Sequence, residues 1–398
     1  MRYLHITSFL HAREELNRVG VEPYGVTAML PKMKNANIIL EGIECKVANI
    51  LKQEMLSIGG DVAVARGAVD CSISKTDAII IGTVKQIGRL ADKIAVQPFG
   101  LGQIAKDLRG LLANLESRSC TLHTPSGELE LGTRTFIMGI LNVTPDSFSD
   151  GGMLPTTGDA IARSARMEEE GADIIDIGGE STRPGAASIT ADEEIKRILP
   201  VIRELRKKTS LPISIDTQKA EVARVALNEG VDIINDISAL RYDKAMVGIA
   251  AEYGVPVVLM HMRGVPTTMQ EGDLAYESLT GEVLGFLRER IAYAVSVGIA
   301  KENIIVDPGI GFGKSVQDNA QLIRRLPELK TLGHPILVGP SRKGFIGLTA
   351  GGGPHDRLEG TAAAVTAAIM NGAHIVRVHD VKFMKRVAGM ADAIVRED

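Results

Sequence analysis

Residues 212–236, PISIDTQKAEVARVALNEGVDIIND, place two short apolar runs on either side of a segment that can form a helix. The runs PISID (212–216) and VDIIND (231–236) are rich in isoleucine, and each ends in an aspartate. Runs of this length joined by a helix are typical of a βαβ unit, whose parallel strands are covered by helices. The stretch therefore predicts an α/β fold with repeated βα units.

The same alternation continues in both directions, from about Thr135 to the end of the chain. Six further apolar runs are strand candidates: TFIMGILN (135–142), ADIIDI (172–177), PVVLMH (256–261), NIIVD (303–307), PILVG (335–339) and HIVRVH (374–379). Within 191–208, Ile195, Ile198 and Ile202 recur at the spacing of one helix face. Eight βα units in ~260 residues predict a TIM (β/α)8 barrel.

The preceding part of the chain predicts a smaller α+β domain, which divides the protein into 1–118 and 119–398. Three segments indicate order: a helix in 46–60, a buried strand in 77–82 and an amphipathic helix in 101–117. The pattern TLHTPSGELEL (121–131) predicts a hairpin that leads into the barrel. The first domain contains no nucleotide-binding or metal motif. Its role is left open between a structural or oligomerisation function and an interaction with another enzyme.

Composition excludes several classes of protein. The 398 residues are 45% hydrophobic and 24% charged, with a net charge of -4, so neither a nucleic-acid nor a membrane partner is expected. The three cysteines, Cys45, Cys71 and Cys120, fit neither a disulfide framework nor a C-x-x-C metal site. No signal peptide and no run of eighteen apolar residues is found, so we expect a cytoplasmic protein.

Polar residues follow every predicted strand. In a TIM barrel the active site is built at the carboxyl ends of the strands. The residues at these ends are Asn142, Glu180, Ser181, Thr182, Arg183, Asp216, Asn235, Asp236, His261, Asp307, Ser341, Arg342, Lys343, Arg377, His379 and Asp380. Asp and Asn are also ordinary turn residues, which is the alternative explanation for any one of them. Together they predict a mouth that binds anions and hydrogen-bond donors.

Five segments together resemble the dihydropteroate synthase family. MGILNVTPDSFSDGG (138–152) is similar to the family's opening signature, and GADIIDIGGESTRPGA (171–186), VDPGIGFGK (306–314), PSRKGFIG (340–347) and VRVHDV (376–381) follow in the family's order. The resemblance implies a transferase that condenses para-aminobenzoate with 6-hydroxymethyl-7,8-dihydropterin pyrophosphate, giving 7,8-dihydropteroate and pyrophosphate. It also implies that sulfonamides compete with para-aminobenzoate.

The resemblance implies a pterin site at the barrel mouth. Asp307 would accept hydrogen bonds from the 2-amino group and ring N–H, Asp216 and Asn235 would contact the remaining ring atoms, and Lys343 would meet the carbonyl. The other residues expected there are Met260, Gly311, Phe312, Gly339 and Arg377. Met260 and Phe312 could equally be plain core residues.

A second implied site holds the pyrophosphate on Asn142, Arg377 and His379. The resemblance also implies one Mg²⁺, with Asn142 as its protein ligand and phosphate oxygens and water as the rest. The alternatives are a structural role for His379 and an ion pair between Arg377 and Asp380 or another barrel carboxylate.

A third implied site holds para-aminobenzoate on the loops that follow the first and second strands. The residues expected around it are Phe148, Thr182, Arg183, Pro184 and Gly344. The implied mechanism is dissociative, with Asp150 stabilising the cation formed as pyrophosphate leaves. The expected catalytic residues are Asp150, Lys343, Arg377 and His379.

Two positions depart from the family pattern. Gly344 follows the lysine where many relatives have serine or a larger residue, and Ala239 with Leu240 replaces paired glycines. We expect the second departure to change loop shape more than chemistry. The alternative functions are a methyltetrahydrofolate–corrinoid methyltransferase and a non-catalytic pterin-binding protein. The resemblance further implies a homodimer formed through late barrel helices.

Overall fold

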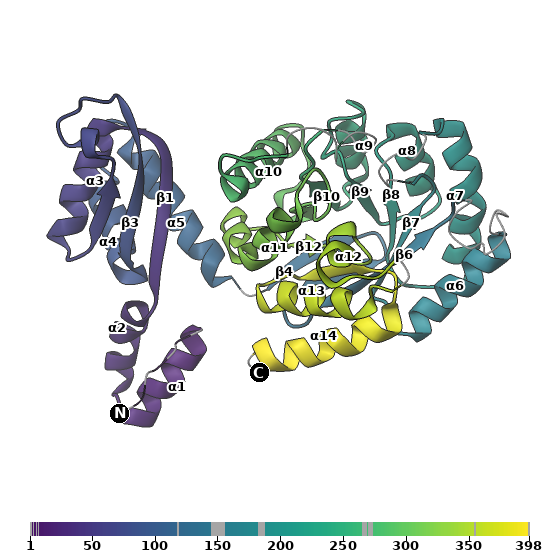
Figure 1. Ribbon diagram of the computed structural model, residues 1–398, viewed down its shortest axis with the longest axis horizontal. Coiled ribbons are helices and arrows are strands. Elements are labelled where there is room, and N and C mark those ends of the chain that lie inside the picture. The colour runs from purple at the N-terminus through teal and green to yellow at the C-terminus, as the bar shows by residue number, and fades with distance from the viewer. Residues whose placement is uncertain are drawn as a thin grey trace. The chain divides into compact units, whose positions relative to one another are not determined.

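The computed structural model describes residues 8–117, 119–144, 156–181, 188–264, 274–353 and 356–396, together with residues 2, 4, 6 and 269. These residues form two compact units, Met1–Glu116 and Ser117–Asp398 (Figure 1). The sequence-based boundary lies at residue 118, close to this division. Each unit has its own hydrophobic core.

The first unit is an α+β domain around a three-stranded antiparallel sheet of order β1-β3-β2. Its elements are α1 (Phe9–Val19), α2 (Pro23–Met33), β1 (Asn35–Glu44), α3 (Cys45–Ser57), β2 (Asp61–Val64), the 3-10 helix η1 (Arg66–Ala68), β3 (Lys75–Thr83), α4 (Val84–Ile94) and α5 (Leu101–Glu116). The prediction that 77–82 is a buried strand was wrong in part: Ile80 is buried, but Ile79 and Ile81 are 40% and 44% exposed. Only one face of this sheet is covered by helices, so buried and exposed residues alternate along its strands.

The second unit begins with the predicted hairpin, β4 (Cys120–Thr124) and β5 (Gly127–Leu131), followed by eight parallel strands. These are β6 (Phe136–Asn142), β7 (Ile174–Gly178), β8 (Ile213–Asp216), β9 (Ile233–Asp236), β10 (Val257–Met260), β11 (Ile304–Asp307), β12 (Leu337–Val338) and β13 (Ile375–Val378). Their order is β11-β10-β9-β8-β7-β6-β13-β12, and a bridge between Val306 and Ile336 joins β11 to the segment before β12. The sheet is thus closed, which confirms the TIM barrel.

Helices cover the outside of the barrel (Figure 1). They are α6 (Thr157–Glu169), α7 (Ala191–Arg206), α8 (Ala220–Asn228), α9 (Met246–Tyr253), α10 (Leu279–Ser296), η2 (Lys301–Asn303), α11 (Val316–Arg324), η3 (Leu326–Leu332), α12 (Gly344–Ala350), α13 (Leu358–Met370) and α14 (Val381–Val395). Outward strand residues such as Ile137, Ile215 and Val306 pack against them. Among the described residues, no helix is long and apolar enough to span a bilayer.

The inside of the barrel is apolar at the amino end of the strands and polar at their carboxyl end. Leu122 and Leu131 of the hairpin are fully buried against inward residues at the amino end of the strands. Those residues are Met138, Ile174, Ile233, Val258, Ile305, Leu337 and Ile375. Because side chains on one face recur every second residue, the next inward positions include Asp176, Asn235, Asp307 and Arg377. The hairpin closes one end, and the polar positions lie toward the other.

Candidate active site at the carboxyl end of the barrel

A pocket lies at the carboxyl end of the strands. It is lined by Asp216, Asn235, Ile237, Met260, Asp307, Ile310, Phe312, Gly339, Lys343 and Arg377. Of the nine residues expected around the pterin, all except Gly311 line it. Gly311 lies directly beneath Lys343, because a Cβ built there would be 3.0 Å from Lys343 Cδ. The structure therefore gathers residues from five barrel strands and three loops at one place.

Arg377 is the charged centre of this pocket. Its Nε donates to Asp176 Oδ2 at 2.5 Å and its Nη2 donates to Asp216 Oδ2 at 2.6 Å. Asp176 is fully buried and also accepts a hydrogen bond from Asn235 Nδ2 at 3.2 Å. Asp176 thus orients both Arg377 and Asn235. Asp176 was not among the residues expected from sequence, because Ile177 and Gly178 follow it in β7, although it is in phase with the inward Ile174.

The ion pair of Arg377 with Asp216 leaves one oxygen of Asp216 available to a ligand. Burial raises the pKa of Asp216, although Arg377 acts to lower it. Burial acts to lower the pKa of Arg377, but Asp176 and Asp216 raise it above its ordinary value. Asp216 Oδ1 is buried and has no hydrogen-bond partner among the described residues. A buried oxygen of this kind is costly unless a ligand N–H meets it.

Asp307 offers a second carboxylate from the end of β11. One oxygen, Oδ1, accepts from the backbone N–H of Gly309 at 2.6 Å. Burial raises the pKa of Asp307 to about 6, while this hydrogen bond and the charge of Lys343 oppose the rise. Gly309 has φ +70°, and a Cβ there would lie 1.9 Å from His261 O. Glycine is therefore required for the turn that holds Asp307.

Lys314 is a buried amine beside the pocket and was not among the residues expected from sequence. Its Nζ contacts His261 Nδ1 at 2.9 Å and donates to Phe312 O at 3.0 Å. Burial lowers the pKa of Lys314 to about 7 and the pKa of His261 to about 2. His261 is therefore neutral. Through its hydrogen bond to Phe312 O, Lys314 holds the backbone of the loop that follows β11.

The pocket also has an apolar wall. Met260 and Phe312 are 3% and 6% exposed and belong to a small cluster with Ile237, Met262 and Met269. Lys343 Nζ lies 4.0 Å from the centroid of the Phe312 ring, a cation–π distance. Met260 and Phe312 are therefore core residues and pocket residues at once, so the two alternatives considered from sequence do not exclude each other.

Polar residues from β6, β12 and β13 surround the rim near Arg377. Asn142 ends β6, and a Cβ on the facing Gly178 would be 3.2 Å from Asn142 Oδ1. His379 Nδ1 lies 3.0 Å from Ser341 Oγ. Of the two ion pairs considered for Arg377, the one with another barrel carboxylate is present, to Asp176 and Asp216. Asp380 instead accepts two hydrogen bonds from Arg342, at 3.0 and 2.6 Å.

The loop after β9 forms a left-handed turn without glycine. Ala239 and Leu240 have φ +53° and +64°, so both residues adopt the left-handed conformation that glycine favours. Asp236 holds this loop by accepting from the N–H of Leu240 at 2.8 Å, and Arg290 Nε donates to Ala239 O at 2.8 Å. The departure from paired glycines therefore introduces backbone strain and does not abolish the turn.

Several expected residues lie outside the described part of the chain: Phe148, Asp150, Thr182, Arg183 and Pro184. Their placement is untested, as are the roles expected of them. Gly344, by contrast, is described as the exposed first residue of α12, and a Cβ there would meet nothing within 4 Å. The space beside Lys343 thus accepts a larger residue.

The geometry suits a flat ligand that has several N–H donors and carries an anionic group. Residues 138–379 match the family described as pterin binding enzyme. The fold, the carboxylate-lined pocket and this match define the class as a pterin-binding barrel enzyme.

Individual relatives indicate which kind of pterin-binding enzyme the chain resembles. Dihydropteroate synthase of Synechocystis is 49% identical over 266 residues, which cover 67% of this chain and 92% of that protein. The Xanthomonas albilineans dihydropteroate synthase structure with 4-aminobenzoic acid is 45% identical, with a TM-score of 0.65, covering 70% of this chain and 100% of that one. The chain belongs to the dihydropteroate synthase family, and it is therefore a transferase.

A different kind of relative also matches the first unit. The bifunctional folylpolyglutamate synthase/dihydropteroate synthase of Halobacterium salinarum is 42% identical over 376 residues, or 94% of this chain. The match spans only 45% of that longer protein. The α+β unit is therefore not peculiar to this chain.

Proposed function

We propose that the pocket binds 6-hydroxymethyl-7,8-dihydropterin pyrophosphate with the pterin ring between Asp307 and Arg377. The observation that supports this most directly is the unpartnered, buried Asp216 Oδ1, which lies in a pocket shared with Asp307 and Asn235. These groups supply the acceptors that the ring N–H and amino groups need. Lys343 meets the ring carbonyl, and Phe312 packs on the ring face.

The bond to pyrophosphate breaks first in the proposed reaction. Arg377 and His379 neutralise the departing pyrophosphate, and the pterin ring delocalises the positive charge left on the methylene carbon. Asp150 stabilises this cation. The amine nitrogen of para-aminobenzoate then bonds to the carbon and releases one proton. Phe148, Thr182, Arg183, Pro184 and the Gly344 N–H hold the benzoate.

A magnesium ion fits this site only if the substrate supplies most of its ligands. Among the described residues, no group of three or more His, Cys, Asp or Glu side chains could hold a metal. Asn142 Oδ1 is the neutral oxygen that would bind the ion, and Gly178 leaves space beside it. The ion would neutralise pyrophosphate charge. A chelator should then lower turnover, and added Mg²⁺ should restore it.

The proposed function is tested by measuring pyrophosphate release and dihydropteroate formation together. The wild type should release pyrophosphate only as dihydropteroate forms, and sulfonamides should compete with para-aminobenzoate. Lys343→Ala should reduce turnover strongly, because it removes the cation that meets the ring carbonyl and lies over Phe312. Lys207→Ala is the control, since Lys207 forms an exposed pair with Glu204. Wild-type protein that makes no dihydropteroate would refute the proposal.

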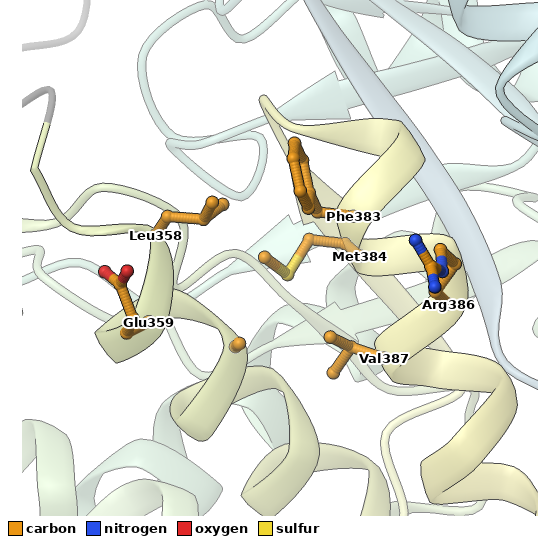
Figure 2. A pocket seen from close by; sticks show the side chains of 7 residues that line it. Leu358, Glu359, Phe383, Met384, Arg386 and Val387 are labelled. Atoms are coloured by element: carbon orange, nitrogen blue, oxygen red, sulfur yellow. The ribbon is translucent and has the colours of Figure 1, made fainter.

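We also propose a homodimer formed through α13 and α14. A hollow between these helices is lined by Leu358, Glu359, Ala362, Phe383, Met384, Arg386 and Val387 (Figure 2). Phe383 is 53% exposed and Met390, farther along α14, is 64% exposed, so apolar surface is available for a second copy. Sedimentation of the wild type and Phe383→Asp tests this assembly.

We propose a cytoplasmic location because the three cysteines form no disulfide. Cys45, Cys71 and Cys120 are all free thiols, which is typical of a reducing compartment. Thiol labelling of protein isolated under alkylating conditions would test it.

A further inference from the structure

A buried ion-pair network joins three segments outside the pterin pocket. Lys219 Nζ donates to Glu180 Oε2 at 2.8 Å and to Glu194 Oε2 at 2.6 Å. The side chains of Lys219 and Glu194 are 9% and 0% exposed. Buried ion pairs lose much of their attraction to desolvation and are weak evidence of stabilisation. The position of the network suggests a different use.

Glu180 lies at the base of the loop that follows β7. Its second oxygen, Oε1, accepts from Ser188 Oγ at 2.9 Å and from the backbone N–H of Ile189 at 3.0 Å. One carboxylate thus ties the end of β7 to the residues at which the chain returns toward α7. Although burial opposes it, hydrogen bonds from Lys219, Ile189 and Ser188 lower the pKa of Glu180.

The other side of this base is fixed by α7. Arg197 Nη1 donates to Gly179 O at 3.0 Å. A Cβ on Gly179 would lie 2.7 Å from Ile198 Cγ2 and 2.9 Å from Glu194 Cγ, so the helix packs directly on this backbone. Lys219 joins the carboxylates of Glu180 and Glu194, and hence the loop base to the first turn of α7.

We infer that Lys219 is a positioning residue for the amine substrate, acting through Glu180 on the points where residues 181–188 leave and rejoin the barrel. The inference rests on the proposed function, in which Thr182, Arg183 and Pro184 contact para-aminobenzoate. Lys219 does not line the pterin pocket. Its loss should therefore affect the amine substrate more than the pterin.

The test uses Lys219→Met and Glu180→Gln, assayed for kcat and for the KM of each substrate. Glutamine keeps an acceptor for the Ile189 N–H but loses the ion pair with Lys219. Both variants should raise the KM for para-aminobenzoate about tenfold, as loss of a charged hydrogen bond predicts. The KM for the pterin pyrophosphate should stay within about twofold. Lys207→Met, which removes the exposed pair with Glu204 at the C-terminal end of α7, should change neither KM.

Three results would overturn the positioning role. These are an equal shift in both KM values, a lower melting temperature with both KM values unchanged, and a wild-type KM for para-aminobenzoate in Glu180→Gln. Lys219→Met leaves two carboxylates without their cation and can fail to fold, in which case Glu180→Gln decides. A wild type without turnover refutes the proposed function itself, whereas wild-type turnover with unshifted variants refutes only the positioning role.

Discussion

The two ends of the barrel are built from the same strands but differ completely in character. On β7, β11 and β13 a step of two residues changes Ile174 to Asp176, Ile305 to Asp307 and Ile375 to Arg377. Because a strand returns to the same face every second residue, all six side chains point inward. The amino end is an apolar core, and the carboxyl end is a charged pocket. One short strand therefore contributes to stability at one end and to chemistry at the other.

The carboxyl end also contains the features that cost stability. Asp216 Oδ1 is buried there without a partner among the described residues. Within the described barrel, the non-glycine residues at positive φ are Ala239, Leu240 and Arg342, which follow β9 and β12. Strain and desolvated charge tend to persist where function requires them. At the amino end, Leu122 and Leu131 are buried without either cost.

Arg377→Met should produce the largest effect, and the effect should be on turnover. The substitution removes the cation that lies between Asp176 and Asp216, together with the charge proposed to meet pyrophosphate. Dihydropteroate formation should fall by about 10²–10³-fold, the loss typical of one charge-stabilising group. Arg203→Met is the control, since Arg203 pairs with Glu229 on the surface. Near-normal turnover in Arg377→Met would break the assignment of chemistry to this end.

Leu122→Ala should lower stability and leave turnover unchanged, the opposite of Arg377→Met. Leu122 is fully buried in the hairpin that closes the amino end, so truncation should lower the free energy of unfolding by about 3 kcal/mol. Both KM values should remain those of the wild type. Denaturant unfolding and the coupled assay measure the two quantities, with the exposed Leu348→Ala as control. A large change in KM would show that the two ends are not separable.

The same separation explains what the sequence could predict. The eight strands followed from isoleucine- and valine-rich runs, because a strand buried on both sides must be apolar. β1 was missed because only one of its faces packs on helices, and its burial alternates. Asp216 and Asp307 were found because they end strands, and Asn235 was found because it stands next to Asp236, which ends β9.

Other parts of the site could not be predicted by that rule. Asp176 was missed because it lies within its strand, and Lys314 because nothing in G-F-G-K shows that its side chain turns inward to His261. The strain at Ala239 is a backbone property that the residue types alone do not reveal. The roles of Asp150 and Thr182, in segments outside the described residues, remain predictions.

The pH dependence of pterin binding is a further test of the charged pocket at the carboxyl end of the barrel. Burial raises the pKa of Asp307 to about 6, so the carboxylate proposed to accept the pterin N–H groups becomes protonated as the pH falls through that value. Protonation of Asp307 alone should therefore make the affinity about tenfold weaker at pH 5 than at pH 7. Calorimetric titration with the pterin at several pH values measures this. Asp307→Asn should bind weakly at every pH; the wild-type profile in that variant would exclude Asp307 as the titrating group.

Ala239→Gly should have the smallest effect, and its sign is the informative quantity. Ala239 has φ +53°, where an L-residue costs about 1–2 kcal/mol and glycine costs much less. Glycine also gains entropy in the unfolded chain, so the expected net stabilisation is about 0.5 kcal/mol. Ala245, an exposed residue with φ -76°, is the matched control, because glycine there has no strain to relieve and should only destabilise. If both variants are equally destabilised in denaturant unfolding, the strain at the carboxyl end is not stored in this loop. If Ala239→Gly is more stable but has a higher KM for the pterin, the strained turn instead holds Ile237 in the pocket at a cost to folding.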